Sequence, residues 1–291
     1  MDLANSLKGK IGSTRVGVLT VTTEEFDIAR GAFSAANDIP GTGYFVEQLK
    51  NPHSYDVVLK RINQQTNIVS YEVAGGLLED FLPGLVILLG TAGGNSAQDL
   101  ELGDVVVAEY ISYAGYWKYK EGMTLERKLP HDHPSNYLMQ NFIEPLRVRT
   151  DRWRPKIKQP RPAEGNQAEP KMVIGEVVSG NSLYGDSTNA EQRRIMSYFD
   201  KACAFEMEGF GVGRAVHSFR NSVYYNPQFL VIRGVSDFVD KDAAQNQATR
   251  VGWTPYAVHA AAAVATTLVK QYLQTPMEEP QPVNQEGQNG D

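Results

Sequence analysis

Four short polar segments of this sequence carry the residue types best suited to chemistry, and each lies at the end of an apolar run. They are residues 22–27 (TTEEFD), 90–95 (GTAGGN), 205–209 (FEMEG) and 233–237 (RGVSD). Paired carboxylates can act as a general acid and a general base, and glycines let the backbone approach a bound molecule closely. The combination indicates a site that moves protons on a small molecule.

Each segment also has a purely structural interpretation, and the residue pattern alone leaves both open. Residues 90–95, with the Thr91 hydroxyl, form either a ligand-binding loop or an ordinary turn, and they lack the ending of a Walker A loop. Glu24 and Glu25 could be first-turn acids of a helix capped by Thr22 or Thr23. Glu206 and Glu208 would share one face of a strand, or would favour a helix N-terminus. Asp237 is either a helix cap or an acid with a shifted pKa.

Strands and helices in alternation must position these residues. The predicted strands are 15–21, 55–62, 85–89, 104–110, 172–179 and 229–234, and the predicted helices are 23–37, 67–81, 190–199, 208–219 and 253–273. This order predicts an α/β fold, a three-layer α/β/α sandwich with a central mixed, mostly parallel sheet. Ligands of open α/β sheets bind beyond the carboxyl ends of the strands, where the four segments lie.

One domain is expected, over residues 13–274. Residues 1–12 are predicted to be a flexible N-terminus, and residues 275–291, rich in Pro, Glu, Gln, Asn and Gly, a disordered tail. Residues 113–170 break the alternation and are interpreted as a basic insertion or flap. Within 147–161 they hold seven cations against one acid, namely Arg147, Arg149, Arg152, Arg154, Lys156, Lys158 and Arg161 against Asp151.

The composition narrows the class of protein. The 291 residues carry a net charge of −6, which argues against a chain that coats nucleic acid. One cysteine, Cys203, excludes a disulfide framework and a cysteine-rich zinc site. The apolar runs are far shorter than the roughly 20 residues of a membrane span, and the N-terminus lacks the pattern of a signal peptide. These features predict a cytoplasmic protein that binds neither membranes nor nucleic acid.

Taken in order, the motifs resemble the nucleoside phosphorylase and nucleosidase superfamily, and in particular the methylthioadenosine/S-adenosylhomocysteine nucleosidases. That family has an acidic turn after the first strand, then Gly-Ser/Thr-Ala-Gly-Gly, Val-Ser-Gly, Glu-Met-Glu and Arg-x-x-Ser-Asp. This chain has residues 24–25, 90–94, 178–180, 206–208 and 233–237 at the corresponding places. The likeness covers about residues 15–273, and it is the ordered set that is specific.

The resemblance implies hydrolysis of a purine N-glycosidic bond with no metal or other cofactor. As in inverting glycosidases, an acid protonates the leaving group while a base activates water on the other face of the sugar. By resemblance, Asp237 is the acid at purine N7, Glu25 is the base, and Glu206 is a supporting carboxylate near the water. The resemblance also implies substrate-binding residues. Glu208 would bind the ribose hydroxyls, Met207 would lie under the sugar, and Thr91, Ala92 and Gly93 would contribute the glycine segment. Ser236 and Arg233 would hold the water and Asp237, and Leu183 with Tyr184 would lie at the adenine.

Two features separate the chain from the housekeeping nucleosidases. Leu183 stands where those enzymes stack a phenylalanine on adenine, and the 113–170 segment is longer. Other segments resemble the nucleosidase modules of bacterial conflict and defence proteins more than they resemble the housekeeping enzymes. They are residues 103–107 leading into 113–119, 236–238 and 252–253. The targets of those modules include adenine nucleotides. The cations of 147–161 would then suit a phosphorylated substrate. They would equally suit a solvated loop or a subunit contact.

The sequence therefore predicts an adenine nucleosidase acting on an adenosine-containing nucleoside or nucleotide. Whether it is a defence effector with a defence-system partner is left open. The alternatives are a housekeeping methylthioadenosine/S-adenosylhomocysteine nucleosidase, a phosphorolytic phosphorylase, and a non-catalytic sensing or assembly module. Hydrolysis is favoured because Leu88 replaces a phosphate-binding arginine of the phosphorylases, and because Glu24-Glu25 would repel phosphate. The resemblance also implies a homo-oligomer, at least a dimer, and the aromatic residues of 110–119 would suit its interface.

Overall fold

The strands and helices alternate largely as predicted in the computed structural model, which describes residues 13–47, 49–51, 54–127, 129–131, 134–163, 168–182, 185–220 and 224–274. The expected flexible N-terminus, 1–12, and the expected disordered tail, 275–291, lie outside these residues. The strands are β1 (Ser13–Thr20), β2 (Asn37–Ile39), β3 (Tyr44–Val46), β4 (Leu49–Asn51), β5 (Ser54–Arg61), β6 (Leu85–Gly94), β7 (Val105–Tyr113), β8 (Trp117–Lys120), β9 (Met123–Glu126), β10 (Pro130–His131), β11 (Met172–Ser179), β12 (Ala204–Glu206) and β13 (Gln228–Phe238).

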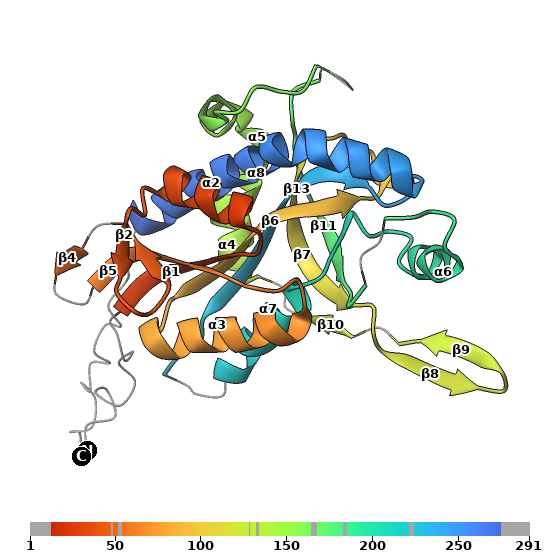
Figure 1. Ribbon diagram of the computed structural model, residues 1–291. Coiled ribbons are helices and arrows are strands. Elements are labelled where there is room, and N and C mark those ends of the chain that lie inside the picture. The colour runs from red at the N-terminus through yellow and green to blue at the C-terminus, as the bar shows by residue number, and fades with distance from the viewer. Residues whose placement is uncertain are drawn as a thin grey trace, which may run out of the picture.

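Helices cover both faces of the sheet, as Figure 1 shows. They are α2 (Thr23–Phe33), α3 (Asn67–Phe81), α4 (Asn136–Leu138), α5 (Glu144–Val148), α6 (Ala190–Tyr198), α7 (Gly209–Phe219) and α8 (Ala243–Gln274), with the short turns η1 (Ser96–Gln98), η2 (Met139–Ile143), η3 (Thr150–Arg152) and η4 (Arg154–Lys156). Helices α2 and α8 lie on one face and α3 and α7 on the other. Each pair of helices covers one of two buried apolar clusters. The three-layer α/β/α prediction is confirmed.

The sheet is mixed, and part of it closes on itself. Strand β1 pairs in parallel with β5 and β6, β6 with β13, and β11 with β7 and β12. The β12–β6 and β13–β7 pairs are antiparallel. Strands β6, β13, β7, β11 and β12 therefore form a closed ring of pairings. The ring holds the ends of β6, β12 and β13 beside one another, and three of the four polar segments lie on those ends.

Two of the four polar segments were expected just beyond strand ends, and they lie inside strands instead. Strand β6 runs through the glycine segment to Gly94, and β13 runs through Asp237 to Phe238. A Cβ on Gly90 would come within 2.5 Å of the Glu25 carboxylate, and one on Gly93 within 2.5 Å of the Val239 side chain. The glycines thus allow the strand to continue through a crowded site, which is why a turn was the wrong interpretation.

The segment 113–170 divides into two parts with different roles. Its first part contains the β8–β9 hairpin, which pairs only with itself among the described residues and projects from the body (Figure 1). Its second part packs into the same apolar cluster as α2 and α8, and contributes fully or nearly fully buried Leu138, Phe142, Ile143, Leu146 and Trp153. The interpretation of the whole stretch as an insertion or flap is therefore wrong for the helical part, because that part completes the core.

Helix α8 begins ten residues before the predicted start at Trp253. Its first turns, from Ala243, are polar and half exposed, so they carry no apolar periodicity from which a helix start could be predicted. The helix also continues through Pro255. This extension brings Arg250 over the end of β13. Within the described parts of the chain, no helix combines the length and the apolar character needed to cross a membrane.

Candidate functional site

Glu25 joins the start of α2 to the glycine segment of β6. Its carboxylate accepts hydrogen bonds from the backbone N–H of Val21 and of Thr22 at 3.1 and 2.9 Å, while the Thr22 hydroxyl accepts one from the Glu25 N–H. This reciprocal arrangement is a capping box. The other carboxylate oxygen accepts from the backbone N–H and the hydroxyl of Thr91, at 2.8 and 3.2 Å. Glu25 is thus both the structural cap that the sequence allowed and a buried acid facing Thr91.

Glu206 and Glu208 share one buried arginine. Nη2 of Arg233 donates to Oε2 of Glu206 at 2.5 Å and to Oε2 of Glu208 at 3.0 Å. All three side chains are at most 6% exposed. Glu206 also accepts from the backbone N–H groups of Glu208 and Gly209 at the start of α7. The helix-terminus interpretation therefore holds for Glu206, and it does not exclude a functional role for the pair.

Two opposing effects act on the charges of this cluster. The pKa of Glu208 is raised to about 8, mainly because its carboxyl group is buried; Arg233 lowers it, and the carboxylates of Glu206 and Glu25 raise it. For Arg233, burial disfavours the charged form, but Glu206, Glu208 and Glu25 outweigh it and raise the pKa of the guanidinium. The guanidinium is therefore a permanent cation whose Nη2 binds two carboxylates, while its buried Nε has no hydrogen-bond partner in the described structure. Glu208 is able to exist as a neutral acid near neutral pH.

Asp237 lies at a bulge of β13, beside Gly93 of β6. Burial raises the pKa of its carboxyl group, while the Ser236 hydroxyl, which donates to Oδ1 at 2.7 Å, and Arg250 lower it. The net shift is upward. A buried carboxyl with a raised pKa can keep a proton near neutral pH and give it to a bound molecule, which is the property that a general acid needs.

The two candidate acids lie at different points along the end of β6. Glu25 binds the backbone of Thr91, whereas Asp237 is the sheet partner of Gly93, two residues further along. Two residues of strand span about 6–7 Å. Inverting glycosidases separate their two carboxyl groups by about 6.5–9.5 Å to admit a water molecule. The two carboxyl groups therefore lie against different residues of the same strand, on the order of separation that an inverting pair uses.

A cavity of about 190 Å³ opens between these groups. Most of the predicted site residues line it, namely Thr91, Ala92, Gly93, Glu206, Met207, Glu208, Ser236 and Asp237. Glu25 and Arg233 lie behind this lining, in contact with Thr91 and with the two glutamates. Leu183 and Tyr184, predicted at the adenine, lie outside the described residues. The structure therefore gathers every predicted site residue that it describes.

Further lining residues were missed from the sequence, namely Thr22, Glu24, Gln65, Ser182, Phe205, Arg250 and Thr254 as parts of this cavity. Thr22, Glu24 and Phe205 belong to segments that were singled out, and Glu24 was expected to repel phosphate, but none of the three was predicted to bind substrate. Arg250 is 13 positions after Asp237 in a polar stretch, and its Nε lies 3.8 Å from Oδ2 of Asp237. Only the early start of α8 brings it there, and no motif signalled that start.

The cations of 147–161 do not reach this cavity. Arg147 and Arg149 pair with Glu144 and Asp151 on the surface. Arg154 binds Glu169, and Lys156 donates to the Thr267 hydroxyl of α8. Arg161 stacks on the rings of Trp253 and Tyr256, on the part of α8 that is buried. None of the seven lines the cavity, so the interpretation of this stretch as a binding site for a substrate phosphate lacks structural support, and the packing interpretation fits.

Comparison with known proteins agrees with this geometry. The model of the family described as the phosphorylase superfamily matches residues 66–270, more than half of the chain. The chain belongs to the phosphorylase superfamily. Within it, the chain is 24% identical over 261 residues to a "Death domain-containing ATP nucleosidase" of Amphimedon queenslandica, and the match spans 84% of this chain and 46% of that protein. It is 23% identical to a 5′-methylthioadenosine/S-adenosylhomocysteine nucleosidase of Listeria welshimeri, over 89% of this chain and 99% of that one.

Solved structures of the superfamily share the fold. The nucleosidase of Helicobacter pylori bound to butyl-thio-DADMe-Immucillin-A superposes with a TM-score of 0.66 at 16% identity, covering 90% of this chain and 100% of that one. A nucleosidase of Colwellia psychrerythraea in complex with adenine gives 0.65 at 19% identity, covering 90% of this chain and 97% of that one. At such low identity these likenesses establish the architecture of the superfamily and not a substrate.

Proposed function

We propose that this chain is a purine nucleosidase that hydrolyses the N-glycosidic bond of an adenosine-containing nucleoside or nucleotide. The observation that carries the proposal is the set of buried charges around residues 90–93. Glu25, Glu206, Glu208, Arg233 and Asp237 are all at most 6% exposed. Buried charge is unfavourable for folding unless it is paired, and it is concentrated at functional sites.

Asp237 acts as the general acid. The C1′–N9 bond breaks with charge building on the sugar, and the purine leaves as a neutral base when Asp237 gives its proton to N7. The Ser236 hydroxyl, 2.7 Å from Oδ1, orients the carboxyl and stabilises the carboxylate that remains. General acid catalysis of this kind contributes about 10²- to 10⁴-fold.

Glu25 acts as the general base. A water attacks C1′ from the face opposite the purine and loses a proton to the Glu25 carboxylate, so that the C1′–O bond forms as the C1′–N9 bond breaks. The Thr91 N–H and hydroxyl hold this carboxylate at the cavity wall. Glu208, with Met207 beside it, binds the ribose hydroxyls. Glu206 supports Glu208 through Arg233, which binds both carboxylates.

Hydrolysis is favoured over phosphorolysis by three features of the structure. Leu88, in the place of a phosphate-binding arginine of the phosphorylases, is fully buried in β6. Arg233 is engaged by two carboxylates and is not free to bind phosphate. Glu24 lines the cavity and would repel a phosphate nucleophile. Water remains as the nucleophile.

Adenine compounds are the expected substrates. The names of the relatives, an ATP nucleosidase and methylthioadenosine/S-adenosylhomocysteine nucleosidases, support an adenosine moiety, and one solved neighbour carries adenine. A housekeeping thioether substrate is the alternative. The described lining offers polar groups from Thr22, Gln65, Ser182 and Thr254, and apolar ones from Ala92, Phe205 and Met207.

The proposal includes assembly and biological context. We expect at least a homodimer, with the exposed aromatic side chains of the β8–β9 region at the contact. Tyr116 and Tyr119 are 51% and 78% exposed, whereas Tyr113 is stacked on Phe210 and belongs to the fold. A dimer mass by light scattering at micromolar concentration supports this; a monomer contradicts it. The name of the ATP nucleosidase relative supports ATP as a substrate, and the proposal adds to this a defence effector that depletes nucleotides together with a triggering partner.

The test is direct. The purified chain is incubated in phosphate-free buffer with methylthioadenosine, S-adenosylhomocysteine, adenosine, AMP and ATP, and free adenine is measured by chromatography. Release from at least one compound, lost in Asp237→Asn, supports the proposal. Failure to release purine from any of them, or strict dependence on added phosphate, contradicts it. For the defence role, expressing cells should accumulate adenine and lose ATP, and Asp237→Asn cells should not.

A further inference from the structure

Arg250 is the one cation among the described residues that line the substrate cavity. It projects from α8 toward the end of β13, with Nε 3.8 Å from Oδ2 of Asp237. That separation is too long for a hydrogen bond. Its Nε is buried and has no hydrogen-bond partner in the described structure. The guanidinium therefore lies in the site with its Nε–H group lacking a hydrogen-bond acceptor.

Among the described residues, the carboxylates around the cavity do not neutralise Arg250 by direct hydrogen bonds. Glu206 and Glu208 are already paired with Arg233 behind the cavity wall. Glu24, which also lines the cavity, is exposed to solvent. The Arg250 side chain lines the cavity and is 29% exposed. An arginine placed like this offers several N–H donors to a ligand that enters.

We propose that Arg250 is the specificity-determining residue of this cavity, and that its guanidinium binds the 5′-phosphate of a purine nucleotide. The inference rests on the proposed function, because it places the purine at Asp237. In the usual anti conformation of a nucleotide, the N7 edge of the purine lies on the C5′ side of the sugar. A purine with N7 at Asp237 therefore brings its 5′ group toward the residue beside Asp237, which is Arg250.

A guanidinium and a phosphate group are chemically matched partners. A guanidinium binds phosphate through two parallel N–H···O bonds, and arginine is preferred at sites of planar, bidentate recognition. Ser182 and Gln65 also line the cavity and offer uncharged polar groups to the phosphates beyond the first. A monophosphate and a triphosphate make the same contact with Arg250, since it holds only the first phosphate.

The experiment compares charged and uncharged substrates. We expect wild type to cleave AMP or ATP with a higher kcat/KM than adenosine. Arg250→Gln should lower kcat/KM for the nucleotides about 10- to 100-fold, mainly through KM, since a charge-assisted hydrogen bond is lost. Adenosine cleavage should change less than about three-fold, and Arg250→Lys should restore part of the nucleotide preference. Arg214→Gln, an exposed arginine on α7, is the matched control and should change neither substrate.

A second variant tests the charge logic in the opposite direction. Glu24→Gln removes a carboxylate from the mouth and should raise kcat/KM for AMP about two- to five-fold with little effect on adenosine. An equal loss for adenosine and AMP in Arg250→Gln would overturn the inference, because Arg250 would then act only through Asp237. A wild type without preference for nucleotides would overturn it too.

Binding measurements separate this inference from the proposed function. AMP is titrated calorimetrically into Asp237→Asn and into Asp237→Asn/Arg250→Gln. A Kd for AMP at least ten-fold weaker in the double variant supports Arg250 as the phosphate-binding residue, even if wild type releases no purine and the nucleosidase proposal fails. An equal Kd in the two variants contradicts the inference, even if purine release succeeds.

Discussion

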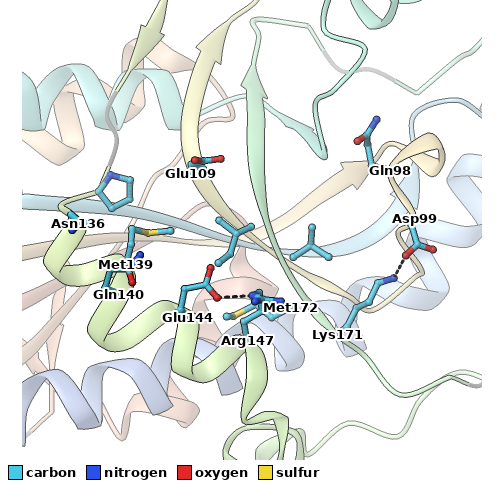
Figure 2. Close-up of a pocket in the computed structure, with 13 residues that line it drawn as sticks. Gln98, Asp99, Glu109, Asn136, Met139, Gln140, Glu144, Arg147, Lys171 and Met172 are labelled. Carbon is cyan, nitrogen blue, oxygen red and sulfur yellow. Dashed lines mark hydrogen bonds and ion pairs between the residues drawn. The ribbon is translucent and has the colours of Figure 1, made fainter.

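Two cavities of this chain carry carboxylates and cations side by side, and they differ in how those charges are held. The larger, of about 890 Å³, lies between β7, the start of β11 and the α4–α5 segment (Figure 2). Its charges form surface pairs. Glu144 binds Arg147 one helical turn away at 2.7 Å, and Asp99 binds Lys171 at 2.8 Å. These four side chains are between 39% and 99% exposed.

The smaller cavity, of about 190 Å³, adjoins an ion-pair cluster that is almost fully buried, although Glu24 and Arg250 in its lining remain in contact with solvent. Arg233 is 1% exposed and binds two glutamates that are 2% and 6% exposed. Exposed pairs contribute about 0–1 kcal/mol and are common on protein surfaces. Buried charges must be matched by partners supplied from several elements. The comparison teaches that buried charge, and not cavity size, distinguishes the proposed active site from the larger cavity.

The largest expected effect is on catalysis at the small cavity. Asp237→Asn keeps the size of the side chain but cannot supply a proton, so we expect kcat to fall by about 10²- to 10⁴-fold while substrate binding changes little. Turnover, ligand titration and thermal melting are measured on the same preparations. Glu144→Gln in the large cavity is the control and should retain wild-type turnover. Near-normal turnover with a lowered melting temperature would show that Asp237 is only structural.

The second prediction concerns stability and compares an arginine from each cavity. Arg233→Met leaves two buried glutamates without a cation, so we expect the free energy of unfolding to fall by about 3–5 kcal/mol. Arg147→Met breaks an exposed pair and should cost no more than about 1 kcal/mol. Urea denaturation measures both.

If Arg233→Met does not fold, the triple variant Arg233→Met/Glu206→Gln/Glu208→Gln keeps the comparison testable. Its glutamines carry no charge and need no buried cation, so stability should partly return. Similar losses for Arg233→Met and Arg147→Met would contradict the view that the two cavities hold their charges differently.

The raised pKa of Glu208 predicts a pH dependence. Its usual value is 4.5 and its folded value is about 8, so between these limits the folded chain holds a proton that the unfolded chain has released. The free energy of unfolding therefore falls as pH rises through this window. Glu208→Gln should flatten the fall between pH 5 and pH 8. The difference between wild type and variant isolates Glu208 from other groups, and parallel curves would contradict the assignment.

The smallest effect is expected at Thr91. Its hydroxyl donates to Glu25 at 3.2 Å, but the Thr91 backbone N–H still donates at 2.8 Å when the hydroxyl is removed. Thr91→Val should therefore cost about 0.5–1.5 kcal/mol of transition-state stabilisation, or less than about ten-fold in kcat/KM. Thr91→Ser is the matched control and should stay near wild type. A loss as large as that of Asp237→Asn would mean that Thr91 contacts the reacting atoms.

Much of the fold could be predicted because local patterns agree with it. The apolar run Leu85–Leu89 marked the central strand, and Thr22 or Thr23 before Glu24 and Glu25 marked the start of α2. The ordered motifs located Glu25, Glu206, Glu208, Arg233 and Asp237. The sequence could not distinguish helix-start acids from the proposed functional acids, because Glu25 and Glu206 bind helix-start N–H groups and also adjoin the small cavity.

The rest depended on long-range packing. Continuation of β6 through its glycines requires neighbours from α2 and β13, which no local pattern reveals. Trp153 is fully buried under α8 although its surroundings in the sequence are basic. Arg250 reaches Asp237 only because α8 starts early and crosses the end of β13. These placements follow from the closed ring of strands and from the course of α8.

The central claim is that water attacks C1′ while Asp237 protonates the purine. It is tested most directly by incubating wild type and Asp237→Asn with the preferred adenosine compound in phosphate-free buffer made with H₂¹⁸O, and following the sugar by mass spectrometry during the first turnovers, before exchange. The account predicts free adenine and a sugar with one ¹⁸O at C1′ for wild type, and little of either for Asp237→Asn. Products that appear only when phosphate is added, with the sugar released as a 1-phosphate, would contradict it.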